Sequence, residues 1–189
     1  MWVNAAEVPR FYPNAVTLTD DETDRAEQLA TIEILSESNL PGRWAVKDSF
    51  NALDGLARRG FDVLLEASWI RATMPSGPSG SDIAWQRETN ASPGLPFGDE
   101  NFAMFKGRRG FTVVAGGMFY RAENMVGVSN VVAEAADAVA VWRSLILLAA
   151  QTFPRLPVVG YESGAELAAA LEAGFELGDP LKVWVRGRD

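Results

Sequence analysis

The chain has 189 residues and a formal net charge of −8, and 48% of its residues are hydrophobic while 22% are charged. This composition excludes a disordered or collagen-like chain, and its acidic balance disfavours a nucleic-acid partner, which would require a basic face. Because the chain lacks cysteine and histidine, it has no means of forming disulfides, thiolate nucleophiles, zinc or iron–sulfur sites, or a Ser-His-Asp triad.

The first half of the chain alternates strand and helix patterns, which are bounded by capping and breaking residues. In chain order the predicted elements are a strand at Asn14–Thr17, a helix at Asp20–Glu37, a strand at Trp44–Val46, a helix that begins at Ser49, and a strand around Trp69-Ile70-Arg71. Serine is a favourable residue at a helix start, and the pair Gly60-Phe61 is typical of a helix end.

The middle of the chain is rich in proline and glycine. Pro75–Ser81 is predicted to be a linker, Asp82–Glu88 a short helical turn, and Asn90–Gly98 a loop. Two strands follow at Gly110–Arg121 and Asn124–Val132, and a tight turn joins them.

The second half repeats the order of the first. After the strand that contains Asn130, the predicted elements are a helix at Ala136–Phe153, a strand at Pro157–Val159, a helix from Ser163 to Gly174-Phe175, and a strand around Trp184-Val185-Arg186. The two serine-to-phenylalanine segments have the same length, so that Leu53 corresponds to Leu167. We interpret this pattern as an internal duplication; two similar units that arose from common packing needs are the alternative.

This order of elements predicts an α+β fold with a mixed central sheet and helices on both of its faces. We divide the chain into an N-terminal half at residues 1–75, a linker and loop region at 76–109, and a C-terminal half at 110–189. No apolar run reaches the roughly 18 residues of a membrane span, and the N-terminus lacks a signal-peptide pattern, so we expect no membrane partner and a cytoplasmic protein.

A hairpin leads into the strand Met125–Ala133, and the long helix, the strand Leu156–Gly160 and the helix ending in Gly174-Phe175 follow it. In this order, the segment Phe111–Arg186 resembles the GNAT superfamily of N-acetyltransferases. The first copy, Asn14–Arg71, resembles the same C-terminal half without its hairpin, so that the chain is similar to a truncated tandem GNAT protein. The resemblance implies a GNAT-type sheet and an N-acyltransferase that uses acetyl-CoA.

The resemblance also implies a binding site. The strands Val126–Ala133 and Leu156–Gly160 would splay apart, and the acyl-CoA would enter between them. The backbone of Asn130, Val131 and Val132 would pair with the pantetheine arm, and a backbone N–H there would polarise the acyl carbonyl. In the last helix, Ser163 occupies the place of a family asparagine, eleven residues before the closing glycine, and Ala170 occupies that of a tyrosine. Ser163 is therefore expected to contact the cofactor.

One segment departs from the family pattern. A glycine-containing loop of the form Arg/Gln-x-x-Gly-x-Gly/Ala would precede the long helix and hold the CoA pyrophosphate with backbone N–H groups. This chain has Glu134-Ala135-Ala136-Asp137 instead. An Asp cap would occupy the helix-end donors, and its charge would repel the anion. The pair Arg108-Arg109 could contact a CoA phosphate from a loop or simply be solvated.

Tyr161, Glu162 and Ser163 lie at a strand-to-helix corner, where α/β sheets gather functional groups. In the functional interpretation, Glu162 is a catalytic base and Tyr161 a catalytic acid. In the structural one, Glu162 and Ser163 cap the helix and Tyr161 is a packing residue.

Two classes of function remain open. The first is an acyl-CoA-dependent N-acyltransferase that modifies an amine of a small molecule or a protein. The second is a catalytically degenerate GNAT-like module that binds a ligand or protein partner through the same wedge. A homodimer built through an exposed strand of either half is a third, structural alternative. No metal site is assigned.

Overall fold

The computed structural model describes residues 1–4, 12–37, 44–73, 81–89 and 98–187. The chain forms two compact units, which we call unit 1 (Met1–Ser68 with Asp179–Asp189) and unit 2 (Trp69–Gly178). Two long strands, β4 (Asp62–Ala72) and β10 (Glu176–Arg186), each run from one unit into the other. The division at residues 1–75, 76–109 and 110–189 stays a prediction.

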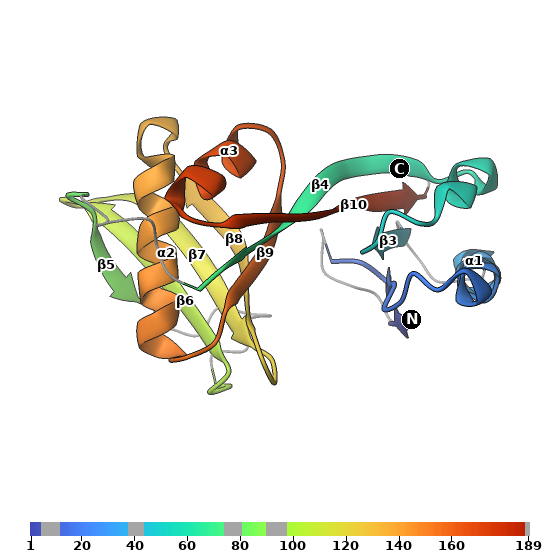
Figure 1. Ribbon diagram of the computed structural model, residues 1–189. Helices are drawn as coiled ribbons and strands as arrows, with labels where there is room; N and C mark the ends of the chain where they lie inside the picture. Colours follow the sequence, from blue (N-terminus) through green and yellow to red (C-terminus); the bar gives the residue numbers. More distant parts are fainter. Residues whose placement is uncertain (5–11, 38–43, 74–80, 90–97, 188–189) are drawn as a thin grey trace. The chain divides into compact units, whose positions relative to one another are not determined.

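Unit 1 is built around one parallel strand–helix–strand connection (Figure 1). Its elements are β1 (Trp2–Val3), β2 (Ala15–Val16), α1 (Glu22–Glu37), β3 (Trp44–Asp48), a 3-10 helix at Asp54–Arg59, and parts of β4 and β10. The strands follow the order β1-β2-β3-β10-β4, with β2 and β3 parallel and β3 and β10 antiparallel. Ile32 of α1, Trp44 of β3 and Trp184 of β10 meet in its core.

The helix predicted to begin at Ser49 is wrong in its first part. The buried Asp48 carboxylate accepts hydrogen bonds from the backbone N–H groups of Ala52 (3.0 Å) and Leu53 (2.8 Å). Asn51 adopts the left-handed conformation with φ of 52°. This turn uses the residues that would form the first helical turn, and only the 3-10 helix at Asp54–Arg59 remains, closed by a left-handed Gly60.

Unit 2 contains the longest stretch of regular sheet. Its own elements are β5 (Ala84–Arg87), β6 (Phe102–Arg109), β7 (Thr112–Arg121), β8 (Val126–Ala133), a 3-10 turn (Ala135–Asp137), α2 (Ala138–Thr152), β9 (Val158–Glu162) and α3 (Gly164–Ala173). The strand order is β10-β4-β9-β8-β7-β6-β5, in which β8 and β9 are parallel and β5 to β8 are antiparallel neighbours.

The short helical turn predicted at Asp82–Glu88 is wrong, because this segment contains the strand β5, and the strand β6 was not predicted. Trp85 of β5 pairs with Gly107 of β6. A Cβ at Gly107 would lie only 2.6 Å from Ile83, so the missing side chain lets β5 pack closely. Of the predicted Pro75–Ser81 linker and Asn90–Gly98 loop, residues 75–80 and 90–97 lie outside the described part of the chain.

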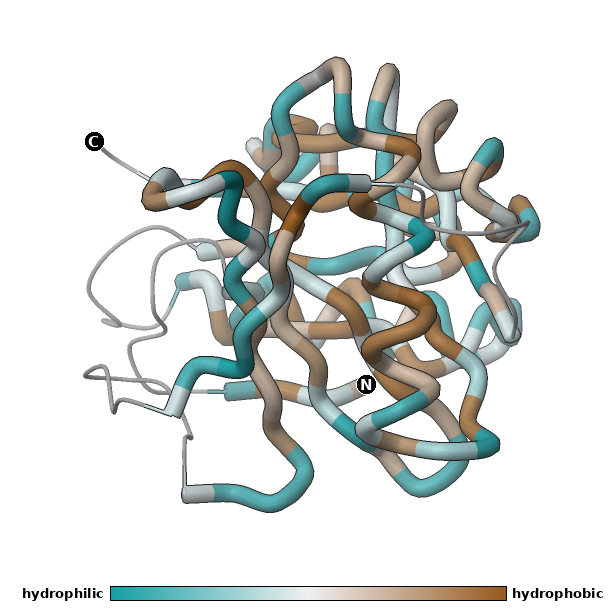
Figure 2. Tube along the Cα trace, turned by 90° about the vertical axis from the view of Figure 1, so that its left-hand side faces the viewer, coloured by the Kyte–Doolittle hydropathy of each residue, from teal (hydrophilic) through white to brown (hydrophobic). Residues whose placement is uncertain are grey.

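The helices α2 and α3 pack against each other and share the hydrophobic core of unit 2. Trp142 of α2 contacts Phe175 edge to face, with ring centroids 5.2 Å apart. Leu145 of α2 lies over β7, where a Cβ at Gly117 would be 2.7 Å from its side chain. Figure 2 shows hydrophobic and hydrophilic residues alternating within single elements, as expected where one face is buried. Among the described residues, no helix is long and apolar enough to cross a membrane.

Candidate functional site

The parallel strands β8 and β9 pair over a short distance only. Their register contains two residue pairs, Val126 with Val158 and Gly127 with Val159. Beyond these pairs, Val128–Ala133 and Gly160–Glu162 have no partner in the other strand. A Cβ at Gly160 would meet Val128 at 2.8 Å, so the strands are still close at this point. Past it the two strands share no residue pair, and we call these two arms the β8/β9 wedge.

The β8 arm carries a bulge. Ser129 pairs with Met118 and Val132 pairs with Gly116, so Asn130 and Val131 together face a single residue of β7. Asn130 has a positive φ of 50°, which is uncommon for a residue with a side chain. Bulges redirect the backbone and leave the extra residue outside the regular ladder. The predicted cofactor-binding residues Asn130, Val131 and Val132 therefore lie at this irregular segment.

The β9 arm carries the predicted catalytic residues. If the register of β8 and β9 were continued, Asn130 would stand opposite Glu162. Glu162 is half-buried, and burial raises the pKa of its carboxyl group to about 7, with a smaller contribution from the charge of Glu166 on α3. Tyr161 packs edge to face on Trp69, with ring centroids 5.7 Å apart. A carboxyl group with a pKa near neutrality can accept a proton at physiological pH.

Ser163 occupies the N-cap position of α3 in an extended conformation, but its side chain makes no capping hydrogen bond. Ser163 thus stands at the predicted N-cap position but does not cap the helix with its hydroxyl. The helix starts through its backbone, where the N–H of Leu167 donates to the carbonyl of Ser163. Ala170, which stands at the tyrosine position of the family pattern, is fully buried in the core. It contributes packing and no proton donor.

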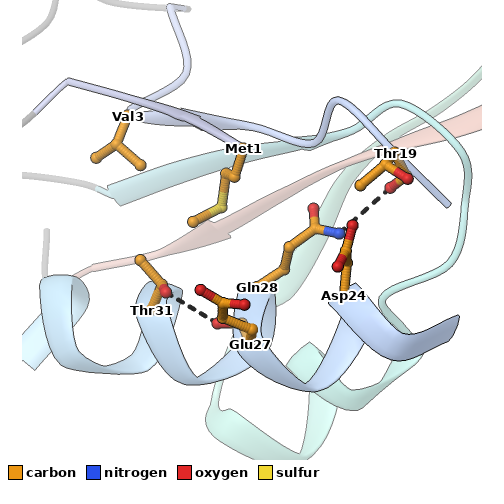
Figure 3. Close-up of a pocket in the computed structure, with 7 residues that line it drawn as sticks. All are labelled: Met1, Val3, Thr19, Asp24, Glu27, Gln28 and Thr31. Carbon is orange, nitrogen blue, oxygen red and sulfur yellow. Dashed lines mark hydrogen bonds between the residues drawn. The ribbon is translucent and has the colours of Figure 1, made fainter. Parts of the chain in front are cut away.

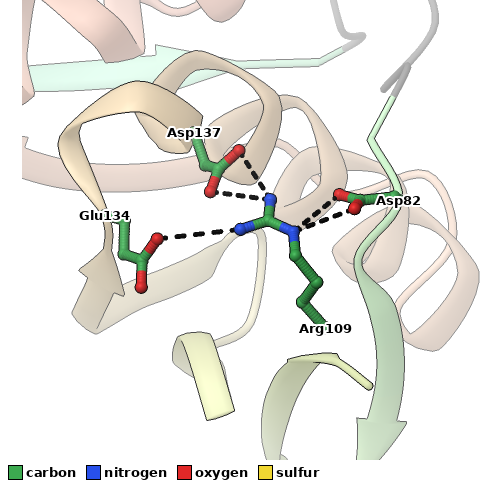
Figure 4. Close-up of polar contacts among 4 residues, drawn as sticks. All are labelled: Asp82, Arg109, Glu134 and Asp137. Atoms are coloured by element: carbon green, nitrogen blue, oxygen red, sulfur yellow. Dashed lines mark hydrogen bonds and ion pairs between the residues drawn. The ribbon is translucent and has the colours of Figure 1, made fainter. Parts of the chain in front are cut away.

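An ion-pair cluster lies at the start of α2 (Figure 4). Arg109 of β6 donates from Nη2 to both carboxylate oxygens of Asp137 at 2.9 Å, and from Nε to those of Asp82 at 2.9–3.0 Å. Its Nη1 lies 3.7 Å from Glu134. The guanidinium lowers the pKa of Asp82. Three carboxylates thus surround one cation, and the cluster has a formal charge of −2.

This cluster corrects two expectations about the segment Glu134–Asp137. Neither Glu134 nor Asp137 makes a side-chain capping hydrogen bond, so neither occupies the backbone donors of the helix start. Arg109 is neither a free phosphate contact nor merely solvated, because carboxylates hold it on three sides. No local pattern in the sequence indicates the cluster, since its members are 25 or more residues apart except for Glu134 and Asp137. Among the described residues, no group of acidic side chains is arranged to hold a metal ion.

The sequence matches no protein-family model, and no curated protein matches it. Solved structures are similar in fold. A conserved protein of unknown function from Staphylococcus epidermidis has a TM-score of 0.62 and 10% identity, covering 87% of this chain and 81% of that one. A GCN5-related N-acetyltransferase from Sphaerobacter thermophilus has a TM-score of 0.55 and 11% identity, covering 87% and 70%.

A tandem GNAT protein from the clavulanic acid biosynthesis pathway has a TM-score of 0.52 and 10% identity, covering 87% of this chain and 70% of that one. At these identities the likeness concerns the fold alone. The chain has the predicted α+β architecture with a mixed sheet and helices, and this fold is similar to that of the GCN5-related and tandem GNAT structures.

Proposed function

We propose that the protein is an N-acyltransferase that takes the pantetheine arm of an acyl thioester into the β8/β9 wedge. The observation that supports this most is the short pairing of β8 and β9, which ends after two residue pairs. An extended pantetheine arm has amide groups that can pair with unpaired strand backbone, as a peptide does when it adds to a sheet edge. The bulge at Asn130 and Val131 supplies such a backbone on the β8 arm.

The residues of this chain would divide the work as follows. Glu162 accepts a proton from the ammonium group of the acceptor, and the neutral amine then attacks the thioester carbonyl carbon. A C–N bond forms and the C–S bond breaks. A backbone N–H of the bulge stabilises the charge on the carbonyl oxygen during this step. Tyr161 donates a proton to the departing sulfur and regains one from the attacking nitrogen, so that a neutral amide and a thiol leave the site. The proton held by Glu162 passes to solvent.

The nucleotide end of CoA does not fit this site well. In the GNAT pattern its pyrophosphate would lie at the start of the long helix, where this chain has the Asp82, Glu134 and Asp137 carboxylates around Arg109. A cluster with a net negative charge repels a second anion. The proposal therefore assigns the pantetheine thioester to the wedge and assigns no contact to the diphosphate.

A second candidate is favoured by the same cluster. A GNAT-type module that has lost catalysis would keep the wedge and use it for another ligand or a protein partner. The three carboxylates around Arg109 favour this candidate, because they already neutralise the charge of this cation. For the enzyme we propose an amine of a small molecule or of a protein as the acceptor, and a homodimer through an exposed strand as its assembly.

The two candidates differ in a direct assay. The full chain is incubated with S-acetylpantetheine or acetyl-CoA and a panel of primary amines, and thiol release is measured. The proposal predicts thiol release with S-acetylpantetheine that falls at least about tenfold in Glu162→Gln, because general base catalysis contributes about 10²-fold or more. Saturable binding of the thioester without thiol release would support the non-catalytic module. The absence of both binding and release would refute both candidates.

A further inference from the structure

Unit 1 contains a pocket that lies apart from the β8/β9 wedge. Its volume is about 300 Å³, and it lies between the first half of α1 and the chain segments that carry Met1, Val3 and Thr19 (Figure 3). Four residues of α1 complete its lining, namely Asp24, Glu27, Gln28 and Thr31. This volume is at the lower end for small-molecule sites, so the pocket suits a small ligand rather than a folded partner.

Gln28 presents an unused acceptor to this pocket. The residue is only 4% exposed, and its Nε2 donates to the main-chain carbonyl of Thr19 at 3.3 Å. This hydrogen bond fixes the orientation of the amide, because a flipped amide would place two acceptors against each other. The Oε1 atom is then buried without a hydrogen-bond partner. A buried acceptor without a donor is unfavourable, so a ligand that supplies a donor is stabilised here.

Two further side chains of the pocket can only accept. Asp24 and Glu27 add two carboxylates, and neither side chain has an ion-pair partner among the described residues. The hydroxyl of Thr31 already donates to the main-chain carbonyl of Glu27 at 2.8 Å. Met1 and Val3 supply the apolar wall. The pocket thus offers negative charge, a buried neutral acceptor and a short apolar surface.

From these contacts we infer that the pocket binds a small organic cation with N–H donors, an ammonium or a guanidinium group on a short alkyl chain. The cationic head donates to Gln28 Oε1 and lies near the carboxylates of Asp24 and Glu27, and the alkyl chain lies against Met1 and Val3. The inference concerns unit 1 and does not depend on the acyltransferase proposal.

The test is a titration of the ¹⁵N-labelled full chain with n-butylammonium, followed by two-dimensional NMR. The inference predicts saturable shifts in the amides of Asp24–Thr31 and in the side-chain amide of Gln28, with a dissociation constant on the order of 1 mM. Three further probes separate the contributions of the charge, the N–H donors and the alkyl chain to binding. Butylguanidinium has the same charge and also N–H donors, tetramethylammonium has the charge but no donor, and 1-butanol has the chain but no charge.

Variants test the assigned groups. Asp24→Asn/Glu27→Gln is expected to weaken n-butylammonium binding about fivefold or more, since two exposed charges are removed. Glu22→Gln removes one exposed charge of the same helix outside the pocket and is expected to change the affinity less than about twofold. Gln28→Met removes the buried acceptor but keeps a side chain of similar volume, and it is expected to weaken the binding of n-butylammonium. The thermal midpoint of this variant shows whether it still folds.

Binding of n-butylammonium or butylguanidinium with much weaker binding of tetramethylammonium and 1-butanol supports the inference. It is overturned if neither N–H cation causes saturable shifts, if tetramethylammonium binds equally well, or if Glu22→Gln weakens binding as much as the double variant does.

Discussion

Arg109 donates from a single nitrogen, Nη2, to both carboxylate oxygens of Asp137 at 2.9 Å, and so joins the end of β6 to the residue before α2. The same guanidinium binds Asp82, which lies just before β5. One side chain therefore connects three segments of unit 2 that are far apart in the sequence. Charge-assisted contacts of this kind add specificity of position as well as energy.

Replacement of Arg109 by Met is expected to lower the free energy of unfolding, because three carboxylates then repel one another without a cation. Urea unfolding measures this change. Arg108→Met is the matched control, since Arg108 makes a single hydrogen bond to the carbonyl of Phe111. Equal losses in both variants would mean that the cluster contributes nothing specific.

Removal of negative charge at the start of α2 should improve the binding of a ligand that carries phosphates. In Glu134→Gln/Asp137→Asn, Arg109 loses two of its three partners, and the formal charge of the cluster changes from −2 to zero. Calorimetry is expected to show tighter binding of acetyl-CoA and unchanged binding of S-acetylpantetheine. An equal gain for both ligands would show that the charge acts on something other than the diphosphate.

The raised pKa of Glu162 predicts that the stability of the folded chain falls as the pH rises. Its pKa is about 7 in the folded chain against an ordinary value of 4.5, so the folded state binds this proton more tightly than the unfolded state. The contribution of Glu162 to stability is thus present below about pH 4.5 and is lost as the pH rises toward about 7. The stability of Glu162→Gln relative to the parent chain should therefore increase across this window.

Thermal midpoints of both proteins from pH 5 to pH 8 measure the effect of Glu162. Glu176→Gln, which replaces an exposed carboxylate at the start of β10, serves as the control and should show no such trend. Parallel curves for Glu162→Gln and the parent chain would contradict the raised pKa.

Gly117 is expected to tolerate no side chain. A Cβ there would lie 2.7 Å from Cδ2 of Leu145, which is fully buried between α2 and the sheet. Gly117→Ala should lower the free energy of unfolding by about 1–3 kcal/mol through overpacking. Gly127→Ala is the control, because its Cβ would meet only the carbonyl of Tyr120 at an ordinary distance of 3.7 Å. Comparable stability of the two variants would show that α2 can shift away from β7.

The sequence predicted well those features that depend on local pattern. The long helix appears as α2, the strand that contains Asn130 as β8, and the last helix as α3 with its closing Gly174. Both units contain a parallel strand–helix–strand connection, β2-α1-β3 and β8-α2-β9, which fits the duplication that remains a prediction. The assignment of Glu162 and Tyr161 as catalytic residues also remains a prediction.

Features that depend on distant partners were missed. The end of β6 has the sequence Lys106-Gly107-Arg108-Arg109, and such a polar segment with a glycine does not indicate a strand. It forms a strand here because Trp85 of β5 pairs with Gly107 and packs over it. The Arg109 cluster requires residues from three segments, so no spacing rule reveals it. Asp48 diverts the chain from a helix only because its carboxylate is buried in unit 1.

The β8/β9 wedge as the site of a pantetheine thioester is the central claim, and a titration of the ¹⁵N-labelled full chain with S-acetylpantetheine tests it most directly. We expect saturable shifts concentrated at Asn130–Val132 on one arm and at Tyr161–Ser163 on the other. The absence of saturable shifts, or shifts confined to segments outside these two arms, would contradict the claim.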